Sequence, residues 1–127
     1  MDLAEEFCEA CHKDSPQVPV EDEQSLLEAI PDWELIEVKG VKRLKRVIKV
    51  KGWRPAVDLT NAIAALADES GHHPMIITAW GRVTVQWWTH AIRGLHRNDF
   101  VMAAKVDALP DADKAYCTTD RCEYMAP

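Results

Sequence analysis

Two short stretches of β-branched and aromatic residues, with a glycine between them, place the strongest constraint on how this chain can fold. Residues 83–89 alternate in the manner of a strand with one buried face, and residues 75–80 form a natural partner. Gly81-Arg82 between them is a two-residue connection of the kind that favours a tight turn. The pattern therefore predicts a β-hairpin in which Trp80 pairs with Val83.

Histidines flank this predicted hairpin on both sides. Continuing the same pairing outward sets His73 opposite His90 on one face of the sheet. His72 precedes the first strand and can lean toward the same place. Imidazole exchanges protons near neutral pH, and three of the five histidines of the chain gather here. We therefore expect the chemistry of the protein to take place at this hairpin.

Apolar periodicity in the first half of the chain predicts one helix followed by another hairpin. Residues 21–30 begin with acidic side chains and continue with apolar residues at helical spacing. Residues 33–50 alternate partially on either side of Lys39-Gly40, a dipeptide that favours a turn. We expect the lysine and arginine residues of this hairpin to project into solvent and to discourage edge-to-edge aggregation.

Two further helices are predicted on either side of the histidine-flanked hairpin. One begins near Pro55 and is ended by Gly71, so that His72 follows it immediately. The other begins near His96, with Asp99 placed to accept hydrogen bonds from the exposed N–H groups of its first turn. The order α-β-β-α-β-β-α predicts an α+β fold, with one four-stranded antiparallel sheet and the helices packed on one face.

Length and composition predict one compact domain between a leader and a tail. A chain of 127 residues with 47% apolar residues can bury one ordinary core. We expect an irregular, cysteine-containing leader over residues 1–20, an α+β domain over residues 21–109 and a tail over residues 110–127. Trp53 and Trp87 are interpreted as core residues of the domain.

Charge and hydropathy argue against two classes of protein. The formal charge of −6 argues against a nucleic-acid binder that works by phosphate neutralisation. No apolar run in the sequence approaches the length of a membrane-spanning helix, and the acidic N-terminus lacks the apolar core of a signal peptide. We therefore expect a cytoplasmic protein.

The four cysteines lie in two pairs near the ends of the chain, away from the histidines. Cys8, Cys11 and His12 match the spacing for covalent haem attachment, but that chemistry needs an exported chain. Together with Cys117 and Cys122, the first pair could hold zinc. Reduced thiols in flexible ends are the favoured interpretation, with a disulfide after oxidation as a variant.

The spacing of polar residues around the hairpin resembles the signature of the pterin-4a-carbinolamine dehydratases. The resemblance extends over residues 26–108, and residues 8–16 and 87–100 look like the bacterial branch that is associated with phenylalanine hydroxylase. The residues that carry the signature are Asp68, His72, His73, Pro74, Trp80, His90 and Asp99.

The resemblance implies an enzyme that dehydrates 4a-hydroxytetrahydrobiopterin to quinonoid dihydropterin without a metal or an organic cofactor. It also implies pterin recycling for an aromatic amino-acid hydroxylase, functional coupling to phenylalanine hydroxylase, and a homodimer or homotetramer. The implied catalytic residues are His72, His73 and His90, the supporting carboxylates are Asp68 and Asp99, and the implied substrate contacts are Pro74 and Trp80.

Dehydration needs one group to protonate the departing hydroxyl and another to accept the N5 proton. We assign His72 and His90 to proton transfer and His73 to holding the pterin and its hydroxyl, with the two carboxylates fixing tautomers. The chain departs from the family at two positions: Asp68 stands where Glu is commoner, and His96 stands where Thr often caps the third helix.

Other interpretations stay open. Members of this family also serve as dimerisation cofactors for transcription factors, and a role in molybdopterin metabolism is a further alternative. Three histidines could also hold a metal that activates water, although consecutive strand side chains point apart, which makes joint ligation by His72 and His73 awkward. His12 and His96 are interpreted as ordinary polar residues.

Overall fold

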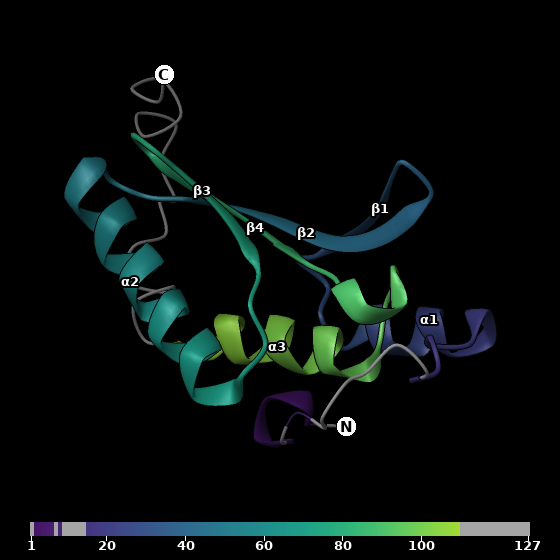
Figure 1. Ribbon diagram of the computed structural model, residues 1–127. Helices are drawn as coiled ribbons and strands as arrows, with labels where there is room; N and C mark the ends of the chain where they lie inside the picture. The colour runs from purple at the N-terminus through teal and green to yellow at the C-terminus, as the bar shows by residue number, and fades with distance from the viewer. Residues whose placement is uncertain (1, 7, 9–14, 110–127) are drawn as a thin grey trace.

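The computed structural model describes residues 2–6, 8 and 15–109, and these residues form one antiparallel sheet with the α-helices on one side of it (Figure 1). The strand order is β1-β2-β4-β3. The predicted α+β fold and its element order are confirmed. The described elements are η1 (Leu3–Glu5), α1 (Val20–Glu28), β1 (Glu34–Val38), β2 (Val41–Lys49), α2 (Trp53–Ser70), β3 (Met75–Ala79), β4 (Arg82–Trp87), η2 (His90–Ile92) and α3 (Arg97–Asp107).

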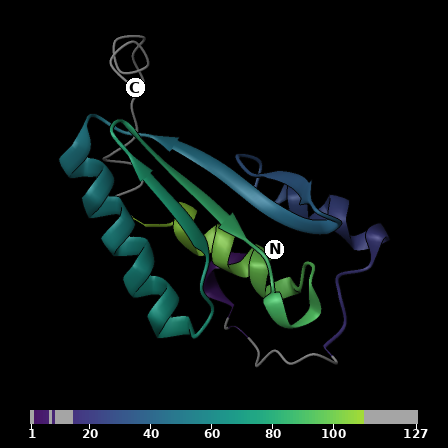
Figure 2. The ribbon, with the colours of Figure 1, turned by 45° about the horizontal axis from the view of Figure 1, so that its top comes forward.

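The core lies between the sheet and the helices. Alternate residues of the central strands β2 and β4 face the helices, as the period-two pattern requires. Helix α2 runs beside β3 in both ribbon views, and α3 crosses below the sheet (Figures 1 and 2). Trp53 is 54% exposed, so its assignment to the core is wrong, whereas Trp87 is fully buried. Other fully buried side chains are Leu44, Ile48, Leu59, Ile63, Val83, Val85, Phe100 and Met102.

Helix α2 ends where the sequence predicts. Gly71 has φ 67° and ψ 21°, a left-handed conformation in which glycine carries no Cβ penalty. The His72 N–H closes the last turn by donating to the Ala67 carbonyl at 3.2 Å. Pro74 disfavours helical backbone at His73, so the chain passes directly from α2 into β3. Both adjacent histidines therefore lie at this junction.

The turn between β3 and β4 lies one residue earlier than predicted. Trp80 and Gly81 form the turn and Ala79 pairs with Arg82, so the predicted pairing of Trp80 with Val83 is wrong. Both backbone polar groups of Gly81 bond to the segment that joins β2 to α2, at 3.0 and 3.3 Å. This contact with a distant part of the chain favours the observed register. A prediction from local turn preferences cannot take such a contact into account.

The observed register does not pair His73 with His90. Strand β3 begins at Met75 and β4 ends at Trp87, so both histidines lie beyond the paired strands. The prediction that they are cross-strand neighbours is therefore wrong. His90 belongs instead to the short helix η2, where it is exposed.

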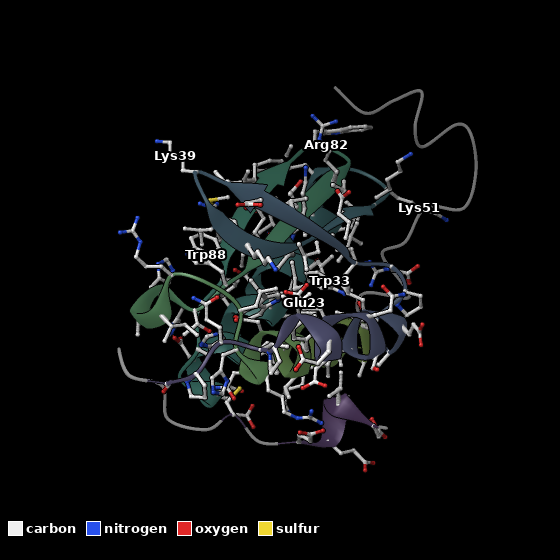
Figure 3. All side chains as sticks on the ribbon, turned by 90° about the vertical axis from the view of Figure 1, so that its right-hand side faces the viewer. Glu23, Trp33, Lys39, Lys51, Arg82 and Trp88 are labelled. Atoms are coloured by element: carbon white, nitrogen blue, oxygen red, sulfur yellow. The ribbon has the colours of Figure 1, made fainter. Side chains whose placement is uncertain are left out.

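Basic residues of β2 make specific contacts, contrary to the expectation that they project into solvent. Lys42 Nζ lies 2.6 Å from Glu23 Oε1 of α1, and Arg46 forms an ion pair with Asp107 at the end of α3. Asp107 also accepts a hydrogen bond of 2.9 Å from the indole of Trp33. Figure 3 shows Glu23 and Trp33 between α1 and the sheet. These contacts tie the sheet to two helices.

Part of the leader packs against α3. Leu3 of η1 is 2% exposed and belongs to the hydrophobic core. Arg97 donates two hydrogen bonds of 2.8 Å to the carboxylate of Glu6, and Lys105 donates one of 2.8 Å to the Ala4 carbonyl. The bonds from Arg97 hold the pKa of the Glu6 carboxyl below its ordinary value. A three-residue helical turn is too short to leave a periodic signal in the sequence.

Several predictions concern residues outside the described ranges, namely His12, Cys11, Cys117, Cys122 and the tail over residues 110–127. Cys8 is described, and it is partly buried against the core. Among the helices of the described ranges, none combines the length and the apolar character needed to cross a membrane.

Candidate active site

The imidazole of His72 lies between a buried carboxylate and a buried indole. Its Nε2 is 2.7 Å from Oδ1 of Asp99, and its ring is stacked on Trp87 with centroids 5.6 Å apart and planes at 7°. The His72 side chain is 12% exposed, and that of Asp99 is fully buried. Residues of β4 and α3 therefore fix the orientation of an imidazole that follows α2.

Asp99 accepts hydrogen bonds on both carboxylate oxygens. Its Oδ2 accepts from the Thr89 hydroxyl at 2.7 Å and from the His96 backbone N–H at 2.9 Å. Two donors on one oxygen favour an ionised carboxylate, because such a group can only accept. Oδ1 faces Nε2 of His72, so this contact favours the tautomer that carries a proton on Nε2 and leaves Nδ1 free of the carboxylate.

The same carboxylate caps the first turn of the third helix, as predicted. His96 is the N-cap residue of α3, and its Nδ1 accepts from the Asn98 N–H at 3.0 Å. Asp99, three residues on, accepts a hydrogen bond from the His96 backbone N–H, which completes a capping box. The capping contacts hold Asp99 in place for its contact with His72.

His73 and Asp68 form a second histidine–carboxylate pair. Nε2 of His73 lies 3.0 Å from Oδ1 of Asp68, at the C-terminal end of α2. The two side chains are 63% and 81% exposed, so water weakens the attraction between them. Pro74, partly buried, follows directly. This pair is open to solvent, whereas the His72–Asp99 pair is enclosed.

A tight loop carries His90 away from the end of β4. Thr89 and Gly94 exchange backbone hydrogen bonds of 2.9 and 3.4 Å across it. The ring of His90 lies 4.6 Å from that of Trp88, tilted by 48°. In the view of Figure 3, Trp88 lies just above the η2 loop. Among the described residues, His90 is therefore supported by an aromatic side chain and not by a carboxylate.

The structure thus joins the predicted residues in pairs. Among the described residues, no hydrogen bond or ring contact connects His90 to either of the other two histidines. Trp80 lies in the hairpin turn, at the far end of β3 from the histidines. Figure 3 shows the neighbouring Arg82 at the opposite end of the hairpin from Trp88. Within one chain, Trp80 is therefore not brought to the site.

Sequence reasoning gave no site role to several residues that shape this region. Trp87 is itself one of the alternating core residues of β4, and nothing local in the sequence indicates that an imidazole stacks on it. Thr89 comes just after the alternating residues, where a polar residue is common at the end of a strand, so its position carries no specific signal. The Arg43 guanidinium lies 3.8 Å from the centroid of Trp88 and donates to Gln86 at 3.0 Å. Only the pairing of β2 with β4 could have revealed this contact.

Metal-ligating side chains do not converge in the part of the chain that the structure describes. No group of three His, Cys, Asp or Glu residues there is arranged to hold a metal ion. His72, His73 and His90 all belong to that part. Their geometry therefore does not support the three-histidine metal site that the sequence left open.

Comparison with known proteins finds one family. The family model described as pterin 4 alpha carbinolamine dehydratase matches residues 16–109. A protein of Syntrophotalea carbinolica is 50% identical over 107 residues, which cover 84% of this chain and 96% of that protein. A protein of Saccharophagus degradans is 51% identical over 108 residues, which cover 85% and 96%. Both carry the provisional name pterin-4-alpha-carbinolamine dehydratase.

A solved structure shares the fold. The crystal structure of a transcriptional coactivator/pterin dehydratase from Brucella melitensis matches with a TM-score of 0.66 and 28% identity, over 73% of this chain and 97% of that one. Fold and sequence therefore define an α+β protein of the pterin dehydratase class. The chain belongs to the pterin-4a-carbinolamine dehydratase family, and the resemblance noted in its sequence is confirmed.

Proposed function

We propose that this protein dehydrates 4a-hydroxytetrahydrobiopterin to quinonoid dihydropterin. The observation that carries the proposal is the contact of 2.7 Å between His72 and the buried Asp99, in a chain whose relatives are named as pterin dehydratases. An imidazole with one nitrogen engaged by a carboxylate keeps the other nitrogen for exchanging a proton with a substrate.

The reaction needs two proton transfers. The C4a–O bond breaks while an acid protonates the departing hydroxyl, so that it leaves as water, and a base takes the N5 proton as the C4a=N5 double bond forms. His72 and His90 transfer these protons. Asp99 stabilises His72 when its ring carries both protons. His73, oriented weakly by Asp68, holds the pterin and its hydroxyl, and Pro74 contacts the ring.

The proposal includes the setting of the reaction. The dehydrated pterin returns to an aromatic amino-acid hydroxylase, and the protein is functionally coupled to phenylalanine hydroxylase. It works in the cytoplasm, without a metal or an organic cofactor, as a homodimer or homotetramer. The resemblance of residues 8–16 and 87–100 to the bacterial branch of the family supports this setting.

A coupled assay tests the proposal. Phenylalanine hydroxylase generates the carbinolamine, and an excess of quinonoid-dihydropterin reductase reports its dehydration. We expect the wild type to accelerate dehydration over the spontaneous rate, and His90→Ala to remove most of that acceleration. His12→Ala, at a histidine with no assigned role, serves as the matched control. A wild type that gives no acceleration contradicts the proposal.

A second candidate function is partner binding. The relative of known structure carries a name that joins transcriptional coactivator to pterin dehydratase. Binding through a protein surface does not need the proton-transfer group of His72. A partner that is retained by His72→Ala as well as by the wild type would therefore show a second role separate from the dehydratase site.

A further inference from the structure

A segment of the leader crosses the loop that carries His90. Gln17 Nε2 donates to the Ile92 carbonyl at 3.1 Å, and the Val18 N–H donates to the Leu95 carbonyl at 2.8 Å. These two contacts join residues 16–18 to the loop at positions three residues apart. In Figure 2 the chain passes beside the η2 loop on its way into α1.

Backbone hydrogen bonds within residues 89–94 fix part of the shape of the loop, including one from the Ile92 N–H to the Thr89 carbonyl at 3.3 Å. The Arg93 N–H donates to the His90 carbonyl at 3.2 Å, and Arg93 has a left-handed φ of 51°. A residue with a Cβ adopts that conformation only when its surroundings hold it there. The bridge between Thr89 and Gly94 closes the base of the loop. The bonds from Gln17 and Val18 add contacts from outside the loop, at Ile92 and Leu95.

The leader segment borders a pocket as well as the loop. A cavity of about 500 Å³ lies between residues 16–19, α1 and the start of α3. Side chains that pack tightly resist displacement, and a cavity on one side of a segment removes that resistance. Val18 packs against the core, so this apolar contact and the two hydrogen bonds to the loop together position the segment.

Gly94 fits closely against the amide of Gln17. A Cβ placed on Gly94 would lie 2.5 Å from Oε1 and 2.6 Å from Cδ of Gln17. Such distances are too short for non-bonded heavy atoms, so a methyl group there must displace the amide. A side chain at position 94 would therefore break the bond from Gln17 to Ile92.

We propose that Gln17 is a positioning residue for the dehydration, because it holds the η2 loop and thereby the imidazole of His90. This inference rests on the proposed function, which makes His90 a proton-transfer group. Gln17 acts through the loop and has no assigned contact with substrate. It belongs to the leader, which the sequence interpretation left outside the domain.

Kinetics of Gln17 variants test the role of the amide. We expect Gln17→Ala and the isosteric Gln17→Glu, which cannot donate to the carbonyl, to lower kcat about three- to tenfold, the effect of one neutral hydrogen bond. The melting temperature should stay unchanged, because Gln17 is exposed. The matched control is Gln24→Ala, which removes an exposed glutamine amide bonded to Glu28 within α1 and should leave kcat unchanged.

A double-mutant cycle tests whether Gln17 acts through the loop. Gly94→Ala should lower kcat in the wild type, and should have little further effect in Gln17→Ala, where no amide remains to be displaced. Amide hydrogen exchange at Arg93 and Gly94 should accelerate in Gln17→Ala. If the losses in kcat from Gln17→Ala and Gly94→Ala multiply in the double variant, the inference is wrong. It is also wrong if the wild type is active and Gln17→Ala matches it in kcat and in amide exchange. Either result would leave the proposed function standing. An inactive wild type would overturn the proposed function and, with it, the link to dehydration.

Discussion

Asp99 caps a helix and orients an imidazole with the same carboxylate. Oδ2 accepts from the backbone of His96 and from the Thr89 hydroxyl, while Oδ1 meets His72. Because α3 already fixes the carboxylate, the His72 ring is oriented before a substrate arrives. A group that is fixed in advance needs little reorganisation during the reaction.

Replacement of Asp99 by Asn should therefore impair catalysis more than folding. The Asn carbonyl can still accept from the His96 backbone, but its NH₂ group would face His72 and favour the opposite tautomer. We expect kcat to fall on the order of 100-fold, the low end of what general acid–base catalysis contributes. The coupled dehydration assay measures the change, and thermal unfolding checks that the fold persists.

Asp68→Asn is the matched comparison, since it removes the carboxylate of the exposed pair. We expect a loss of less than about fivefold, because exposed ion pairs contribute little. An equal loss in the two variants would contradict the distinction between an enclosed and an open pair.

Sequence reasoning located each member of the buried pair correctly and assigned the carboxylates to fixing tautomers, but it did not predict which histidine Asp99 contacts. Gly71 places His72 at a helix end, and the capping pattern places Asp99 at a helix start. Both positions were predictable because both signals are local in the sequence. His72 and Asp99 are 27 residues apart, and the packing of α2 against α3 brings them together. The stack of His72 on Trp87 depends on the same packing.

At the scale of elements, the junction between α2 and β3 decides where two histidines lie. Gly71 ends the helix in a left-handed conformation, and the space that its Cβ would occupy is open: apart from its chain neighbours and the backbone of α2, no described heavy atom lies within 4 Å. The requirement for glycine at this position is therefore one of backbone conformation and not of space.

Gly71→Ala should destabilise the protein by about 1 kcal/mol, the cost of a left-handed backbone with a Cβ. Gly71→Asn should cost less, because asparagine adopts this conformation more readily. Urea unfolding of both variants gives the two free energies of unfolding. If Gly71→Ala is as stable as the wild type, the left-handed end of α2 is not required.

The two hairpins show where sequence rules for turns suffice. Lys39 and Gly40, with φ of 51° and 80°, form the predicted turn, and Val38 pairs with Val41. Within the described ranges, no backbone hydrogen bond joins that turn to a distant segment. In the second hairpin, Gly81 bonds to residues between β2 and α2, and the turn moves by one residue. The error changed the inferred partner of His73.

For the molecule as a whole, a cluster around Asp107 joins the end of α3 to the sheet. Arg46 and Trp33 both donate to its carboxylate. Burial raises the pKa of the Asp107 carboxyl above its ordinary value of 3.8, and outweighs these two donors, which act in the opposite direction. The folded protein therefore keeps this proton to a higher pH than the unfolded chain does.

The raised pKa predicts a sign for the pH dependence of stability. As pH rises from about 3.8 through the raised pKa, the unfolded chain loses the Asp107 proton first, so the contribution of this group to stability falls. Urea unfolding of the wild type and Asp107→Asn between pH 3 and 7 measures it. The stability of the wild type relative to the variant should decline with rising pH. An increase would mean that the ion pair with Arg46 outweighs burial.

The fold class was predictable because periodicity and turn residues specify the order of elements, and the order restricts how their apolar faces can be buried. The docking of Leu3 and Gln17 was not, since a short segment without periodicity finds its place only through tertiary contacts. Both residues lie in the leader that the sequence assigned to no element.

The central claim is that His72, held by Asp99, transfers a proton during dehydration of the carbinolamine. The most direct test compares single-turnover dehydration of 4a-hydroxytetrahydrobiopterin by the wild type and by His72→Ala at the same protein concentration. The account predicts a rate well above the spontaneous one for the wild type, and a loss on the order of 100-fold or more for the variant. Equal rates for the two proteins would contradict it.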